Sequence, residues 1–225
     1  MSHILDRPIW ASLQTHQAYL REGVGPAIRF PADIAPFAVG QDASPETALA
    51  LSKLIPSGDD LYLMEAAPPP APDGVSSVHR AVVQMVWTHF PDAPKPVAPM
   101  EDLDDSHAAE MLALATLTRP GPFRAHTHTL GRFIGVREKG ELIAMAGERM
   151  HLTGFREISA VCTHPDHRGK GLGAMLMHAV GARIRADGEQ PFLHAYADNH
   201  TAIALYRKLG FEVRRELIHA LWKQA

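Results

Sequence analysis

Apolar positions in the second half of the chain alternate between strand-like and helix-like spacing. Residues 172–184 repeat their apolar positions every three to four residues, which predicts a helix with one buried face. Residues 201–209 predict a second helix, which Gly210 ends as a C-cap. Residues 211–217 and 218–223 are interpreted as a final hairpin. The other predicted strands of this half are 131–137, 142–150, 157–163 and 191–196.

The first half has a mixed pattern and two breaks rich in proline. Segments 61–65 and 81–87 predict a hairpin whose loop is the first break. The second break holds four prolines within residues 91–99, and proline can continue neither a strand ladder nor a helix. A domain boundary is therefore predicted there, with an N-terminal α/β domain over residues 1–95 and a second domain over 100–225.

A basic, glycine-rich turn separates the strand at 157–163 from the helix that begins near residue 172. Glycines let the backbone approach a ligand closely, and a helix N-terminus directs free N–H groups and a positive dipole end at the same point. Arg168 and Lys170 add two full positive charges. The turn therefore predicts a binding site for a phosphate or pyrophosphate group.

Other phosphate-binding patterns fit this turn less well. A P-loop needs Ser or Thr after its lysine, and Gly171 stands there instead. A dinucleotide fingerprint matches Gly169, Gly171 and Ala174, with Glu189 at about the spacing of the ribose-binding acid, roughly 20 residues on. The polar insert 163–168 and the short chain after the turn oppose that interpretation. A dinucleotide-dependent oxidoreductase stays as the third hypothesis.

The spacing Arg168-x-x-Gly171-x-Gly173 resembles the pyrophosphate signature R/Q-x-x-G-x-G/A of the GNAT superfamily of N-acetyltransferases. Residues 199–211 resemble the second conserved block of that family, and the resemblance extends from roughly residue 132 to the C-terminus. It implies an α/β (α+β) fold with a mixed, mostly antiparallel sheet flanked by helices. The smaller α/β N-terminal domain is considered as a degenerate acetyltransferase-like half.

The resemblance also implies a function, direct transfer of an acetyl group from acetyl-CoA to a primary amine of a small molecule or amino acid. In the family, the turn binds the pyrophosphate and the preceding strand binds the pantetheine arm through backbone atoms. Asn199 is expected to contact the arm while also serving as a helix N-cap. The implied acetyl-CoA-binding residues are Val161, Cys162, Thr163, Arg168, Gly169, Lys170, Gly171, Leu172, Gly173 and Asn199.

The resemblance identifies Tyr206 as the acid that protonates the departing thiolate, by its place in the second block. A general base is expected among the carboxylates of the central strands. Glu157, at the start of the strand that leads to the turn, is the first candidate, and Glu148 is the alternative. Loops 119–130 and 150–156 are expected to select the acceptor.

Composition narrows the remaining possibilities. The single cysteine, Cys162, excludes an internal disulfide and is expected in the core rather than as a nucleophile. No metal is expected, because the histidine pairs at 126/128 and 164/167 lack the further ligands that a metal needs. A net charge of −3 favours neither nucleic acid nor membrane as a partner. We expect a cytoplasmic protein, with a homodimer considered and a non-catalytic acetyl-CoA sensor as the alternative function.

Overall fold

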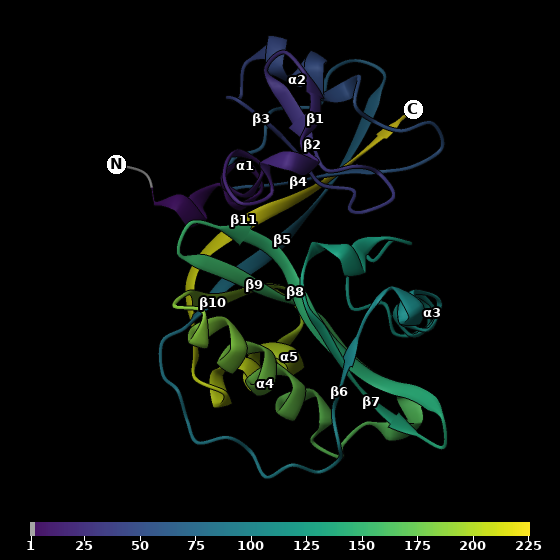
Figure 1. Ribbon diagram of the computed structural model, residues 1–225. Coiled ribbons are helices and arrows are strands. Elements are labelled where there is room, and N and C mark those ends of the chain that lie inside the picture. The colour runs from purple at the N-terminus through teal and green to yellow at the C-terminus, as the bar shows by residue number, and fades with distance from the viewer. Residues whose placement is uncertain (1–2) are drawn as a thin grey trace.

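A computed structural model describes residues 3–225 of the chain and shows one eight-stranded sheet through its centre, in the order β4-β11-β5-β10-β9-β8-β7-β6 (Figure 1). Neighbouring strands are antiparallel except β9 and β10, which are parallel. The predicted mixed, mostly antiparallel sheet is therefore confirmed. Its strands are β4 (Leu61–Glu65), β5 (Val75–Trp87), β6 (Glu101–Leu103), β7 (Phe133–Glu138), β8 (Glu141–Leu152), β9 (Phe155–Thr163), β10 (Gln190–Tyr196) and β11 (Phe211–Gln224).

Helices cover both faces of the sheet. Helices α4 (Leu172–Ala186) and α5 (His200–Lys208) bury one face, where Leu176, Val180 and Ile203 join the largest apolar core. Helix α3 (Ala108–Thr118) packs on the opposite face against β8 and β9. Because side chains alternate between the faces of a strand, β9 contributes to both cores. The short 3-10 turns are Ile4–Asp6, Ala18–Leu20, Asp105–His107, Thr127–Leu130 and Pro165–His167.

The N-terminal segment forms a further layer on the α3 side of the sheet. It contains α1 (Pro8–Gln14), α2 (Pro45–Ser52) and a small antiparallel sheet of β1 (Glu22–Val24), β2 (Ala27–Arg29) and β3 (Ala38–Gly40). Apolar side chains of this layer share one core with the large sheet. That core includes Leu5, Ile9, Leu13, Phe30, Phe37, Met64, Val82, Met150 and Leu217.

The strand pairing corrects two predicted hairpins. Residues 61–65 and 81–87 do not pair with each other, because β11 lies between β4 and β5. The predicted final hairpin is instead a single strand of 14 residues, whose two edges pair with β4 and β5. No glycine, proline, asparagine or aspartate in β11 favours a tight turn, so the strand continues without a break.

The sheet also continues across the predicted domain boundary. Strands β4 and β5 precede the proline-rich segment 91–99, and β6 to β11 follow it. The predicted division at residues 95–100 therefore falls in a connection between two strands of one sheet. The idea that the N-terminal part is a degenerate acetyltransferase-like half stays a prediction.

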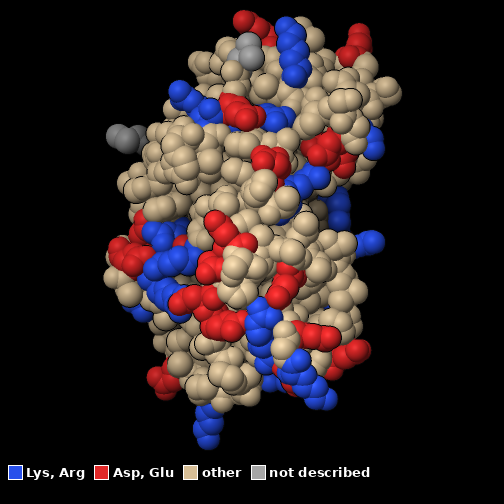
Figure 2. All heavy atoms as spheres, turned by 45° about the vertical axis from the view of Figure 1, so that its right-hand side comes forward, with Lys and Arg blue, Asp and Glu red and all other residues tan. Residues whose placement is uncertain are grey.

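The surface charges and the helix lengths concern possible partners of the protein, nucleic acid and membrane. Basic and acidic side chains are interspersed on the face shown in Figure 2 rather than gathered by sign. None of the helices within residues 3–225 combines the length and the apolar character that crossing a membrane requires.

Candidate active site

Strands β9 and β10 pair over a short stretch and then separate. Their pairing joins residues 155–157 to residues 190–192, after which β9 follows β8 and β10 follows β5. A β-bulge accompanies the separation, because the register with β8 shifts and Ala160 takes a positive φ of 53°. The facing edges of the two strands keep backbone N–H and C=O groups that an extended ligand can bond as an added strand does. This gap lies where the sequence predicts the pantetheine arm.

The glycine-rich turn at the end of β9 presents backbone donors. Gly171 is the N-cap of α4, and the first helical bond runs from the Met175 N–H to its carbonyl. The N–H groups of residues 172–174 therefore have no acceptor within the helix. A Cβ added to Gly169 or Gly171 would meet nothing within 4 Å, and both residues have positive φ, 76° and 80°. Open space and free donors together make a cradle for an anion.

Packing does not require a glycine at position 173, the last position of the signature, either. A Cβ at Gly173 would meet only the Val161 side chain, at 3.9 Å. Arg168 is exposed and makes only a long hydrogen bond of 3.5 Å to the Thr163 carbonyl. Lys170 is 53% exposed and lies 3.7 Å from a Glu138 oxygen. Both cations can therefore turn toward a ligand at low cost.

A cavity that opens to solvent occupies the gap between β9 and β10, with about 760 Å³ of empty space including its open mouth. It brings together four residues that the sequence analysis singles out, Glu157, Val161, Asn199 and Tyr206. The expected acceptor loop 119–130 contributes residues 120–122, whereas the loop at 150–156 contributes none of the lining. The other lining residues are Phe37, Met64, Val82, Arg149, Ile158, Ser159, Ala160, Leu193, His194, Ala195, Tyr196 and His219.

Helix α5 positions Asn199 and Tyr206, the predicted acetyl-CoA-binding residue and the predicted acid, at one end of the cavity. The Asn199 Oδ1 accepts the Ala202 N–H at 3.1 Å, so this side chain is the N-cap of α5. About two turns after this N-cap, Tyr206 packs against Phe211 and the main core. Burial raises the pKa of the Tyr206 phenol, and within residues 3–225 its hydroxyl makes no hydrogen bond. The phenol is therefore protonated at neutral pH and available as a donor.

Glu157 is completely buried at the other end of the cavity. Its carboxylate accepts two hydrogen bonds from Arg149, at 2.8 and 2.6 Å, and one from His194 Nδ1 at 2.8 Å. Burial alone would raise the pKa of Glu157, but Arg149 and His194 outweigh it and lower the pKa to about 2. The carboxylate is therefore charged and a weak proton acceptor.

Gln84 fixes the tautomer of His194. The Gln84 Oε1 accepts from Arg214 at 2.9 Å, and its Nε2 donates to the Leu5 carbonyl at 2.9 Å. The same Nε2 lies 3.0 Å from His194 Nε2, which must therefore be the acceptor. His194 Nδ1 then carries the proton that Glu157 accepts. Both ring nitrogens of His194 make hydrogen bonds within the protein, so this imidazole is a fixed part of the cavity wall.

His219 on β11 differs, because one of its nitrogens has no partner. The Nδ1 lies 3.2 Å from the Tyr196 hydroxyl, whereas the Nε2 is buried without a hydrogen bond. The residue is 7% exposed and lines the cavity. Burial, with the nearby charges of Arg149 and Arg80, lowers its pKa to about 4. A neutral imidazole with an unpartnered nitrogen among residues 3–225 therefore lines the cavity, and no motif in the sequence marked it.

Two predicted candidates point away from the cavity. Glu148 forms ion pairs with Arg132 at 2.7 Å and Arg156 at 3.2 Å, and it is absent from the cavity lining. The Cys162 side chain packs against α3 with Met111, and burial raises its pKa to about 11. A buried, protonated thiol is a poor nucleophile, so Cys162 can reach a ligand only through its backbone.

Comparisons with known proteins identify relatives over parts of the chain. Residues 133–222 match the family described as FR47-like protein. Mycothiol acetyltransferase of Nocardiopsis dassonvillei is 30% identical over 130 residues, which cover 52% of this chain and 38% of the relative. The L-methionine sulfoximine/L-methionine sulfone acetyltransferase of Pseudomonas aeruginosa is 36% identical over 83 residues, covering 35% of this chain and 48% of the relative. The chain thus spans less than half of each of these two relatives.

A solved structure is similar over the whole length. It is a proposed acetyltransferase from the GNAT family of Novosphingobium aromaticivorans, with 37% identity, a TM-score of 0.88 and full coverage of both chains. This match includes the N-terminal layer as well as the signature turn. The chain therefore belongs to the GNAT family of acyltransferases.

Proposed function

We propose that this protein transfers the acetyl group of acetyl-CoA to a primary amine of a small molecule or amino acid. One observation carries the proposal: the anion cradle at residues 169–174 continues along the open edge of β9 into the cavity that holds Tyr206. A long ligand with a pyrophosphate at one end and a reactive thioester at the other matches that path. The two curated relatives are named as acetyltransferases of small molecules, which supports a small acceptor.

Acetyl-CoA would lie along the predicted residues. Leu172, Gly173 and the residues of the turn would donate N–H groups to the pyrophosphate, and Arg168 and Lys170 would add charge. Backbone atoms of residues 161–163 would bond the pantetheine arm, as the resemblance to the family implies. The side-chain amide nitrogen of Asn199 is unused by its capping bond and is available to the same arm.

The acceptor would enter from the opposite side of the sheet. Val161 and Tyr206 pack with the α4 core, whereas Phe37, Met64 and Tyr196 pack with the core of the N-terminal layer. The cavity touches both sets, so it passes between β9 and β10 from one face of the sheet to the other. The N-terminal layer, which carries no recognisable motif, would therefore contribute Phe37 to the acceptor pocket.

In the proposed reaction the amine nitrogen attacks the thioester carbon directly. A C–N bond forms, the C–S bond breaks, and the thiolate takes a proton from the Tyr206 hydroxyl. The amine loses one proton to water in the cavity, and Tyr206 is reprotonated from solvent, so the products are an amide and CoA. Tyr206 is thus the proposed general acid.

Glu157 would position other side chains rather than act as a direct base. Its ion pair with Arg149 and its bond to His194 leave a carboxylate of low basicity. We therefore assign it to holding Arg149 and His194 in place at the acceptor end. His219 Nε2, in the tautomer that donates from Nδ1 to Tyr196, would accept a hydrogen bond from the incoming amine.

The lack of a strong base near Tyr206 also favours a second function, a domain that binds acetyl-CoA without turnover. Calorimetric titration with acetyl-CoA, with CoA and NAD as comparisons, tests the shared part of both proposals. Micromolar binding of acetyl-CoA without binding of NAD supports them, and binding of NAD alone overturns them. A screen of amines by thiol release then separates them, since release faster than with the same amine in the absence of the protein requires catalysis.

A further inference from the structure

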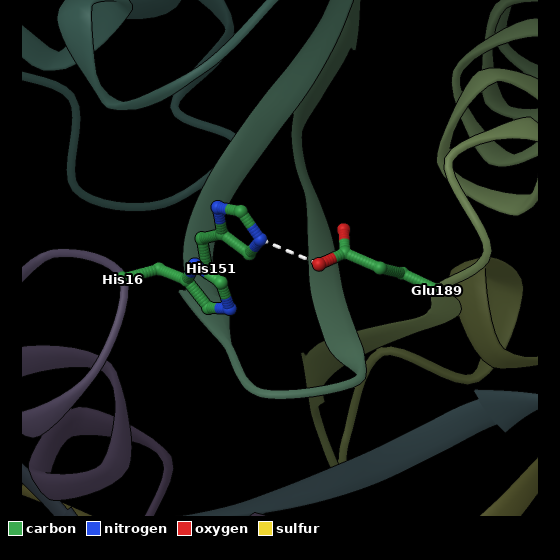
Figure 3. A group of neighbouring side chains, drawn as sticks. All are labelled: His16, His151 and Glu189. Carbon is green, nitrogen blue, oxygen red and sulfur yellow. Dashed lines mark hydrogen bonds and ion pairs between the residues drawn. The ribbon is translucent and has the colours of Figure 1, made fainter.

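Three side chains with metal-binding atoms meet beside the N-terminal layer, although they come from distant parts of the sequence (Figure 3). His16 follows α1, His151 lies on β8, and Glu189 lies between α4 and β10. Their donor atoms all lie within 4.8 Å of one another. We propose that this cluster is a binding site for a divalent transition metal, with Zn²⁺ as the best match.

The donor types suit zinc. Two imidazoles and one carboxylate, with water in the fourth position, form a recurring four-coordinate zinc set. Bonds of about 2.1 Å place neighbouring donors of a tetrahedral site roughly 3.4 Å apart. His151 Nε2 and Glu189 Oε1 are 2.6 Å apart, so an entering ion would replace their hydrogen bond and separate them slightly.

The third ligand needs only a side-chain rotation. The His16 ring is stacked on the His151 ring, with centroids 4.0 Å apart and an angle of 3° between the planes. His16 is exposed, so turning its ring toward the ion meets little resistance and leaves an entry route from solvent. The stacking holds the two candidate ligands next to each other.

A buried glutamine holds the His16 backbone next to β8. Gln17 is 2% exposed, and its Nε2 donates to the carbonyls of Leu130 at 3.2 Å and Arg149 at 2.8 Å. Its Oε1 accepts the His151 N–H at 3.2 Å. The residue after one ligand is therefore tied directly to the backbone of a second ligand, which keeps the site assembled without an ion.

Arg156 is the competitor for this site. Its Nη2 lies 2.8 Å from Glu189 Oε2 and 3.3 Å from His151 Nε2. The same guanidinium also reaches Glu148 at 3.2 Å and Asp187 at 3.1 Å, so it keeps two carboxylate partners when it releases Glu189. A metal must displace one contact of Arg156 and tolerate its charge, and loss of that charge should strengthen metal binding.

Occupancy would join the N-terminal layer to the sheet near the cavity. The ion would link the segment after α1 to β8 and to the loop before β10. Gln17 bonds the carbonyl of Arg149, whose side chain holds Glu157 in the cavity wall. The bound ion would therefore raise the thermal stability of the protein, since it binds the folded chain and spans three segments.

Tag-free, chelator-treated protein titrated with ZnCl₂ tests the site by calorimetry and by the melting temperature, without any need for acetyl transfer. We expect one ion per chain, micromolar affinity and a higher melting temperature. Co²⁺ should give the visible absorption bands of a four-coordinate ion. His16→Ala should weaken binding at least about 10-fold, and His79→Ala, another exposed histidine, should not.

Removal of the Arg156 charge is the second test of the site. Arg156→Gln should tighten Zn²⁺ binding, whereas a site elsewhere on the chain would not respond. Equal binding by His16→Ala and the natural chain would overturn the proposal, as would absence of binding in the natural chain. Binding that appears only in Arg156→Gln would likewise overturn it, because the natural cluster would then be an ion-pair network alone.

Discussion

The two ends of the proposed ligand path are built in opposite ways. At the cofactor end, a contiguous turn offers backbone N–H groups, open space beside its glycines and exposed cations. At the acceptor end, buried side chains from β5, β8, β9, β10 and β11 bond to one another. A ligand common to a whole family can be bound by backbone alone, whereas an acceptor that differs between relatives requires side chains that can change.

This difference predicts that mutations at the two ends have different effects on ligand binding and on stability. Damage at the cofactor end should reduce binding and leave the fold intact, because nothing packs on the turn. Damage at the acceptor end should reduce stability first, because its polar groups are buried and satisfy one another. The following four changes test this contrast.

Glu157→Gln should have the largest effect, and on stability. It leaves the buried Arg149 guanidinium without its carboxylate, and removal of one partner of a buried pair costs about 3–5 kcal/mol. Unfolding in urea measures the loss, and Glu110→Gln is the control. Glu110 pairs with Arg137 on the surface, where such pairs contribute about 1 kcal/mol or less. Similar small losses for both variants would contradict the contrast.

Gly171→Asp should abolish acetyl-CoA binding, with a loss of at least about 100-fold, or roughly 2.7 kcal/mol. The new carboxylate would occupy the open space of the cradle and repel the pyrophosphate. Gly188→Asp is a matched control at the other end of α4, because Gly188 has nearly the same φ, 81°, and equally open surroundings. Calorimetry should show normal binding for Gly188→Asp, and equal losses would mean that backbone strain, not the cradle, is responsible.

The strand, turn and helix at the cofactor end could be predicted from the sequence because their determinants are local. Glycine and arginine at fixed spacing, placed between a strand and a helix, describe most of that geometry by themselves. The acceptor end escaped prediction because its residues look ordinary in sequence. Gln84 and His219 acquire their contacts only when β11 inserts between β4 and β5, an arrangement that the predicted hairpins did not include. Arg149 acquires its role only through its pairing with Glu157 on the neighbouring strand. Pairing between strands that are far apart in the sequence, unlike a turn motif, has no pattern within a short stretch of residues.

Tyr206→Phe lies between the two ends and should affect turnover alone. The variant keeps the ring that packs on Phe211 and removes only the hydroxyl. We expect kcat to fall about 100-fold, the lower range for loss of a general acid, while the Kd for acetyl-CoA stays the same. Tyr19→Phe, at a residue that is 75% exposed, is the control. Equal losses of affinity and kcat would show that Tyr206 binds acetyl-CoA rather than donating a proton.

His219 should give the acceptor end a dependence on pH that the cofactor end lacks. Its pKa falls from 6.5 to about 4 on folding, so between these values the unfolded chain takes up a proton that the folded protein does not. Stability should therefore decrease as pH falls through this window, by about 2 kcal/mol between pH 7 and pH 5. His219→Gln removes the titrating group, so its unfolding free energy should change less over that range than that of the natural chain. The exposed His200→Gln is the control, and an unchanged slope in His219→Gln would show that folding does not lower the pKa of His219.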